Sequence, residues 1–135
     1  MELTVSIVTP QSSVVEGNAN QVTAPSVQGE VGILPSHKPL LASLQEGIVG
    51  VHAQDGTDFF TVSGGFLEVS DNRVTVLAET AEKVSDIDLE RAEAALKDAT
   101  SKLDSLGPES SEYSEEQARI RRAKVRISGA KLASH

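Results

Sequence analysis

The sequence predicts a domain of many short β-strands, a sandwich or a barrel, followed by an antiparallel α-helical hairpin. Two observations support this fold class. In residues 1–84, short apolar segments alternate with polar residues and are separated by pairs of turn-forming residues. Near Ser85, the spacing of the apolar residues changes from two to three or four. Many short strands with frequent turns are typical of sandwiches and barrels, whereas the second spacing is that of an amphipathic helix. We therefore expect a sandwich or barrel domain at 1–84 and a two-helix domain at 85–135.

The strand prediction depends on alternation and on turn residues. Residues 3–7 and 74–78 alternate most strictly, so that one face of each strand is expected to be buried. Short apolar runs between them are Val14-Val15, Ile48-Val49, Phe59-Phe60 and Phe66-Leu67. The predicted turns lie at Gly17-Asn18, Glu46-Gly47, Asp55-Gly56, Gly64-Gly65 and Asp71-Asn72.

The first helix is predicted over residues 85–106, which contain neither Gly nor Pro. Ser85, with Asp88 three residues later, resembles a capping box and is expected to begin the helix. Gly107-Pro108 is expected to end it. One apolar stripe follows the helical spacing: Ala92, Leu96, Ala99, Leu103 and Leu106.

A second helix is expected to begin between Ser110 and Ser114 and to run to about Ser128, where Gly129 would end it. Its apolar positions are Tyr113, Ile120, Ala123 and Ile127. Because alanine brings little apolar area to a contact, the hairpin is expected to be weakly held. Two alternatives stay open: a hairpin that detaches and adopts a second pose, and one that is permanently packed.

The charge is divided unevenly along the chain. Residues 1–118 carry all 20 acidic residues and six basic ones, a net charge of −14, whereas residues 119–135 carry six basic residues and no acidic one, a net charge of +6. An acidic body disfavours nucleic acid as a partner. The basic end indicates either docking onto an acidic protein surface or a solvated helix face.

The sequence contains no pattern typical of a catalytic or metal site. It lacks a P-loop, a Gly-x-Ser-x-Gly motif and cysteine, and its three histidines, His37, His52 and His135, are far apart. No apolar run is long enough to span a bilayer. The N-terminus has no pattern of a signal or transit peptide, so we expect the protein to stay in the compartment where it is made.

Three segments resemble the family of ATP synthase epsilon subunits. Residues 29–41, GEVGILPSHKPLL, resemble the G-x-x-G-x-L-P-x-H-x-P-L signature of that family. Residues 64–69 and 74–79 resemble its last strands, and residues 87–92, IDLERA, resemble its I/L-D-x-x-R-A motif. The resemblance covers essentially the whole chain. It implies a ten-stranded sandwich and a two-helix hairpin.

The resemblance also implies a function. The chain would be a non-catalytic rotor subunit of an F-type ATP synthase that couples proton flow to ATP synthesis. Its sandwich would bind the gamma subunit and the membrane ring of c subunits. Its hairpin would extend toward the catalytic beta and alpha subunits and inhibit ATP hydrolysis. The complex would lie at the cytoplasmic face of the bacterial inner membrane, with this subunit peripheral and not inserted.

The resemblance assigns two sets of contact residues. The set facing gamma and the rotor ring comprises Gly29, Gly32, Pro35, His37 and Pro39. The set facing acidic segments of the catalytic subunits comprises Arg119, Arg121, Arg122, Lys124, Arg126 and Lys131. Arg119, Arg122 and Arg126 are expected to share one helix face.

No cofactor is expected to be required, but ATP as a regulatory ligand is one hypothesis, since some family members bind it. The matching positions are Glu82, Ile87, Asp88, Arg91, Ala92, Arg122 and Arg126. Tight binders carry a basic residue where this chain has Asp98, and an acid there repels phosphate. The alternative for Asp88 and Arg91 is a cap and an ion pair within the hairpin, and we expect weak ATP binding or none.

A second class of function is a free-standing β-sandwich binding module with a helical oligomerisation tail. Co-purification with a gamma-like partner separates it from the rotor subunit. An enzyme is the least favoured class, because no nucleophile, metal cluster or phosphate loop supports it.

Overall fold

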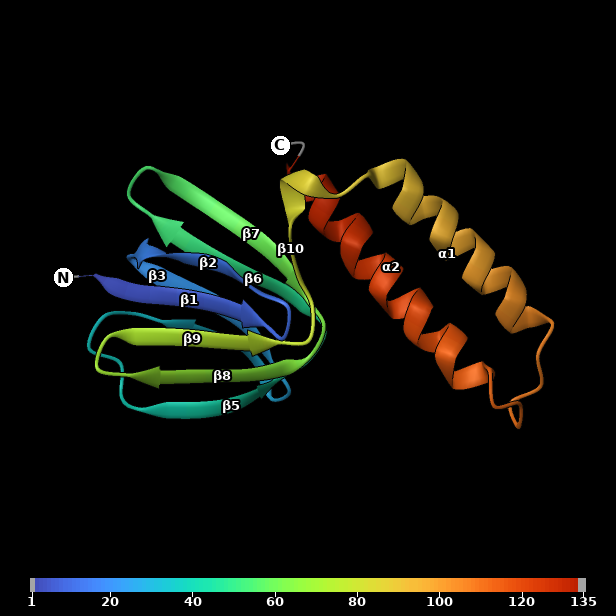
Figure 1. Ribbon diagram of the computed structural model, residues 1–135, viewed down its shortest axis with the longest axis horizontal. Helices are drawn as coiled ribbons and strands as arrows, with labels where there is room; N and C mark the ends of the chain where they lie inside the picture. The colour runs from blue at the N-terminus through green and yellow to red at the C-terminus, as the bar shows by residue number, and fades with distance from the viewer. Residues whose placement is uncertain (1, 134–135) are drawn as a thin grey trace. The chain divides into compact units, whose positions relative to one another are not determined.

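The computed structural model describes residues 2–133, which form two units divided between Lys83 and Val84. Ten strands make up the first unit, and one 3₁₀ helix and two α-helices make up the second within the described residues (Figure 1). This division lies one residue from the predicted boundary.

The strands of the first unit are short. In chain order they are β1 (Leu3–Thr9), β2 (Ser12–Ala19), β3 (Gln21–Ser26), β4 (Gly29–Ile33), β5 (Leu40–Leu44), β6 (Gly47–Ala53), β7 (Gly56–Val62), β8 (Gly65–Ser70), β9 (Arg73–Ala78) and β10 (Ala81–Lys83).

The strands form two layers of five. One layer has the order β10-β7-β6-β3-β4 and the other β5-β8-β9-β1-β2. A single residue pair, Ser26 with Leu44, connects β3 of the first layer to β5 of the second. All pairings are antiparallel except that of β1 with β9. The predicted sandwich of about ten strands is therefore confirmed.

The core of the sandwich consists of aliphatic side chains on alternating strand positions. Leu3, Val5 and Ile7 of β1 are fully buried, as are Val74 and Val76 of β9. These are the residues that the alternation placed inward, so the prediction of a buried face on both strands is confirmed. Burial of each such side chain contributes roughly 1.5–3 kcal/mol.

Four of the five predicted turns lie at junctions between strands, three of them with their second residue, a glycine, as the first residue of the next strand, but the turn at Gly17-Asn18 is wrong. Both residues belong to β2, where Gly17 pairs with Val5 of β1. β2 lies at the end of its sheet, and Gly17 and Asn18 are exposed. Exposed positions of an edge strand do not require apolar or β-branched side chains. Small polar residues that are typical of turns can therefore occur within such a strand.

The second unit begins with the 3₁₀ helix η1 (Val84–Asp86), followed by α1 (Leu89–Asp104) and α2 (Tyr113–Ala133). The capping box at Ser85 is wrong, because Ser85 lies in η1. The N-cap of α1 is Asp88, whose Oδ1 accepts a hydrogen bond from the Arg91 N–H at 3.1 Å. An acid there also faces the positive end of the helix dipole.

The predicted helix ends differ from the observed ones. α1 ends before Gly107 because Ser105 caps it, donating its hydroxyl to the Lys102 carbonyl at 2.8 Å. α2 starts within the predicted range but does not stop at Gly129, which lies buried inside the helix. η1 contacts α2.

Small side chains form the contact between α1 and α2. Ala92 and Ala99 of α1 are fully buried, and Ala123 of α2 is nearly so. Leu96 and Leu103 are only half-buried. The predicted stripe is buried at Ala92 and Ala99 and partly covered at its leucines, and the weak hold expected of so alanine-rich a contact stays a prediction.

Candidate functional sites

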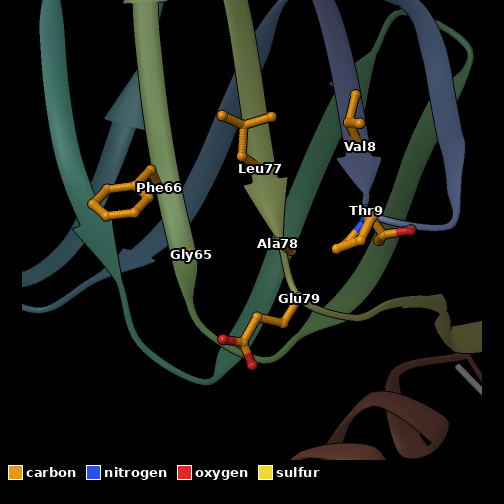
Figure 2. Close-up of a pocket in the computed structure, with 8 residues that line it drawn as sticks. Val8, Thr9, Gly65, Phe66, Leu77, Ala78 and Glu79 are labelled. Atoms are coloured by element: carbon orange, nitrogen blue, oxygen red, sulfur yellow. The ribbon is translucent and has the colours of Figure 1, made fainter.

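An apolar patch lies on the outer face of the sheet β5-β8-β9-β1. The strand register places Phe66 of β8 opposite Leu77 of β9, and Leu77 opposite Val8 of β1. Figure 2 shows these three side chains in a row across neighbouring strands. Phe66 is 51% exposed and Leu77 45% exposed, although both are apolar. Leu41 of β5, 70% exposed, lies diagonally from Phe66 on the same face.

The patch, defined as Val8, Leu41, Phe66 and Leu77, borders an open depression of about 390 Å³. The residues lining this depression are Val8, Thr9, Pro10, Gly65, Phe66, Leu77, Ala78 and Glu79. A contiguous exposed apolar surface on a well-packed domain marks an interaction site more often than chance exposure. We did not predict this patch from the sequence. The available signal was Leu77, which occupies a position of β9 where alternation calls for a polar residue.

The loop between β4 and β5, residues 34–39, is the second candidate. It contains Pro35, His37 and Pro39 of the predicted contact set. Gly29 and Gly32, the other two residues of that set, lie in β4 and not in the loop. Gly32 lies within β4, opposite Thr23, and only Gly29 has a positive φ, of 121°.

The β4–β5 loop carries an exposed apolar residue and several local bonds. Leu34 is 56% exposed, while the preceding Ile33 is fully buried. The His37 N–H donates to the Leu34 carbonyl at 3.1 Å, and the His37 ring Nδ1 lies 2.7 Å from the Lys38 carbonyl oxygen. The two prolines further restrict the backbone. The loop is thus a defined surface and not a disordered connection.

A charged network joins α1 to α2. Arg119 Nη1 donates to both carboxylate oxygens of Glu116, at 3.1 and 2.8 Å, and Arg119 Nη2 donates to Asp98 Oδ2 at 3.1 Å. Lys102 Nζ lies 3.3 Å from the same Asp98 oxygen. The hydrogen bond from Arg119, followed by that from Lys102, lowers the pKa of the Asp98 carboxyl below its ordinary value. The bond to Asp98 in turn raises the pKa of Arg119.

The remaining basic residues of the predicted inhibitory set are all on α2. Arg121, Arg122, Lys124 and Lys131 are exposed, and Arg126 is half-buried. Arg119, also on α2, is engaged with α1 through Asp98. Within the face expected for Arg119, Arg122 and Arg126, Arg119 is therefore already bound inside the hairpin.

The residues matching a nucleotide site have diverse environments. Ile87 and Ala92 are buried apolar residues of the helical unit, Asp88 is the N-cap of α1, and Arg91 and Arg122 are exposed. Glu82 belongs to the other unit, where it pairs with Thr61 across β10 and β7. The cap agrees with the alternative to ATP binding that the sequence left open for Asp88. The Asp88 side chain accepts a hydrogen bond from the backbone N–H of Arg91.

The histidines and acids form no metal cluster in the described part of the chain. His52 lies between two hydroxyl groups, with Nε2 3.2 Å from Thr23 Oγ1 and Nδ1 3.1 Å from Thr57 Oγ1. Its ring also contacts Phe59 edge to face. His135 lies outside the described residues. Within residues 2–133, no helix is both long and apolar enough to cross a membrane.

Comparisons with known proteins agree along the whole chain. The family model "ATP synthase, Delta/Epsilon chain, beta-sandwich domain" matches residues 2–84, and the "long alpha-helix domain" of the same family matches residues 85–131. The ATP synthase epsilon chain of Anaeromyxobacter dehalogenans strain 2CP-1 is 41% identical over 128 residues, 94% of this chain and 96% of the relative. That of Halalkalibacterium halodurans is 42% identical over 125 residues, 93% and 94% of the two chains.

Solved structures share the fold at lower identity. A chain of the Euglena gracilis mitochondrial ATP synthase, in an OSCP/F1/c-ring structure, superposes with a TM-score of 0.82 at 22% identity, covering 99% of this chain and 82% of the other. A chain of the Tetrahymena thermophila central stalk and c-ring gives a TM-score of 0.58 at 16% identity, with coverage of 98% and 97%.

Proposed function

Because the chain belongs to the ATP synthase delta/epsilon chain family, we propose that it works as the epsilon subunit of the central stalk, binding the gamma subunit through the apolar patch on its sandwich. The chain is an accessory subunit and not the catalytic one. The exposed side chains of Phe66 and Leu77, on a sheet whose other face is the core, are the observation that carries this proposal. Their burial against gamma would supply the apolar contact that a permanent rotor joint needs.

Binding of purified gamma to patch variants tests the proposal. Phe66→Asp and Leu77→Asp place a charge in the centre of the patch and are expected to weaken binding roughly 30-fold or more. Val27→Asp is the matched control, since Val27 is 60% exposed in the β3–β4 turn and lies outside the patch. Equal affinity for all three variants and the original chain, with folding verified by circular dichroism, would refute a gamma site on this face.

The β4–β5 loop is the proposed contact to the membrane ring of c subunits. Leu34 offers an exposed apolar side chain, and Pro35 and Pro39 limit the entropy lost when the loop is held against a partner. With both contacts made, torque from proton flow would pass through the sandwich to gamma. The subunit would then be peripheral, at the cytoplasmic face of the bacterial inner membrane.

The helical unit is the proposed brake on ATP hydrolysis. Its exposed basic residues on α2 suit acidic segments of the catalytic beta and alpha subunits. One exposed ion pair contributes only about 0–1 kcal/mol, so several must act together. The double variant Arg122→Glu, Lys124→Glu is expected to raise hydrolysis by the assembled complex. Lys97→Glu, which reverses an exposed charge on α1, is the control. Unchanged hydrolysis in the double variant would contradict a charged brake.

ATP is proposed to bind weakly or not at all. The acidic Asp98 lies on α1 and pairs with Arg119 of α2 and with Lys102. These positive charges are therefore already balanced by protein carboxylates, which disfavours phosphate binding there. Calorimetric titration of the isolated chain with ATP should give no heat of binding at micromolar concentrations. A micromolar dissociation constant would overturn this expectation.

A further inference from the structure

Three residues other than glycine have a left-handed backbone in the described part of the chain. Ser36 has a φ of 69°, Asp71 of 51° and Asn72 of 62°. Ser36 belongs to the β4–β5 loop, and the other two form the turn between β8 and β9. Such conformations cost free energy and persist only where the surrounding structure enforces them. They gather at functional surfaces more often than elsewhere.

One asparagine connects these segments. The Ser36 N–H donates to Asn72 Oδ1 at 2.6 Å, across 36 residues of sequence. The Asn72 main-chain carbonyl accepts a hydrogen bond from the Thr4 N–H of β1 at 2.8 Å. Asn72 thus holds the loop with its side chain while its backbone is tied to the first strand of the sandwich.

Ser36 and Asn72 adopt a positive φ for different reasons. Asn72 tolerates the left-handed region in a turn, since asparagine is among the residues most often found there. Serine is not among the residues that commonly adopt this region. The short bond from its N–H to Asn72 is therefore a constraint that keeps Ser36 in this conformation. Ser36 lies two residues after Leu34 and directly after Pro35, so its φ sets the direction of the exposed part of the loop.

We propose that Asn72 is a positioning residue for the β4–β5 loop, holding Ser36 in its left-handed conformation so that Leu34 and the prolines are presented in one fixed geometry to the rotor partner. This inference rests on the proposed contact between the loop and the membrane ring. Asn72 itself need not touch the partner. Its effect is to reduce the number of conformations that the loop adopts. A loop with many conformations would bind more weakly, because ordering it on binding costs free energy.

Two substitutions at Asn72 separate the acceptor from the turn. Asn72→Gly keeps a residue that adopts positive φ readily and leaves the carbonyl bonded to Thr4, but removes the Oδ1 acceptor. Asn72→Asp keeps an oxygen at the same place and is the conservative variant. Exchange of the Ser36 amide hydrogen reports directly on the bond. It should accelerate in the glycine variant and stay slow in the aspartate variant.

Function is measured by the binding of the F1 sector, assembled with each variant, to membranes stripped of F1. The glycine variant is expected to lower this affinity about fivefold, the loss that one hydrogen bond of ordinary strength would give, while its affinity for gamma stays unchanged. The aspartate variant should bind membranes like the original chain. Fast exchange at Ser36 with undiminished membrane binding in the glycine variant would overturn the positioning role.

A third variant distinguishes this inference from the function beneath it. Leu34→Asp alters the contact itself without touching Asn72. If Leu34→Asp weakens membrane binding and Asn72→Gly does not, the loop is a contact but Asn72 does not position it, and the inference is wrong. If neither weakens it, the proposed contact between the loop and the ring is itself wrong.

Discussion

Gly65, at the start of β8, has a backbone conformation and a neighbour that together exclude a side chain. Its φ is 119°, and a Cβ built there would lie 1.9 Å from the Leu77 carbonyl oxygen. Gly65→Ala is therefore expected to destabilise the sandwich by about 3 kcal/mol or more, from strain and from the shift of β9. Urea unfolding followed by circular dichroism measures this loss.

Gly17→Ala is the matched control for that measurement. Gly17 is also in a strand of the same sheet, but a Cβ there meets no atom within 4 Å. The substitution should change the free energy of unfolding by less than about 1 kcal/mol in either direction. Similar stability of the two variants would mean that β8 and β9 can separate at Gly65 without cost.

Single residues also mark the limit of what the sequence predicts. Buried positions such as Val5 and Val76 followed from alternation, because a strand with one face in the core must place apolar residues at every second position. Leu77 breaks the polar–apolar alternation, because it is an apolar residue at an outward position of β9. The sequence alone did not assign it to an interaction surface, since an apolar residue is ordinarily taken to belong to the core. The bond between Ser36 and Asn72 joins residues 36 positions apart, and no local pattern encodes it.

At the scale of elements, the helix pair is held by small apolar contacts and by one charged network. Helix existence was predictable from spacing and from Gly107-Pro108, but the caps were not. Ser85, Asp86 and Asp88 can all accept a hydrogen bond from a helix N-terminus, and the choice of Asp88 depends on the short η1 turn before it. The pairing of Asp98 with Arg119 depends on the register of α1 against α2, which the stripes alone do not fix.

Removing the α1 cap should weaken that helix. Asp88→Ala deletes the acceptor for the Arg91 N–H and is expected to cost about 1 kcal/mol, whereas Asp88→Ser retains a capping oxygen and should cost much less. Amide hydrogen exchange of residues 89–92 measures local opening of the first turn. Identical exchange in the two variants would show that the cap does not stabilise α1.

The Asp98 network predicts a dependence of helix stability on pH. Its pKa is lowered in the folded hairpin, chiefly by the Arg119 hydrogen bond. A lowered pKa means that the folded state binds the proton less readily than the unfolded one. The resulting stability is fully present well above the ordinary aspartate pKa of about 3.9 and is lost as the pH falls through the lower folded pKa.

Comparison with Asp98→Asn isolates this effect from other carboxylates that titrate in the same range. The original chain should be more resistant than the variant to urea unfolding of its helices at pH 7. The difference should shrink as the pH is lowered below about 4. Lys97→Gln, at the preceding exposed position of α1, is the control. The difference in urea stability between this variant and the original chain should not shrink as the pH falls. A difference that stays constant from pH 7 to pH 3 would exclude a contribution from ionised Asp98.

At the scale of the whole molecule, the apolar core and the basic excess lie in different units. The aliphatic core comprises buried residues between Leu3 and Ala78, all in the sandwich unit. The basic excess lies entirely beyond residue 118, and all six of its residues are in α2. Family membership removes the alternative of a free-standing module with an oligomerisation tail. The chain thus carries its apolar core in one unit and its basic excess in the other, and under the proposed function the first would bind its partner through apolar contact and the second through charge.

A chain ending at Lys83 tests this separation. Because its core is complete without the helices, the truncated chain should fold, unfold cooperatively on heating, and bind gamma with unchanged affinity through the apolar patch. A complex assembled with it should hydrolyse ATP faster than one with the full chain, since the basic residues of α2 are gone. A complex with the full-length double variant Arg122→Glu, Lys124→Glu should also hydrolyse ATP faster than one with the original chain. A truncated chain that is unfolded, or folded but unable to bind gamma, would mean that the helices are structural parts of the rotor joint and not a separable brake.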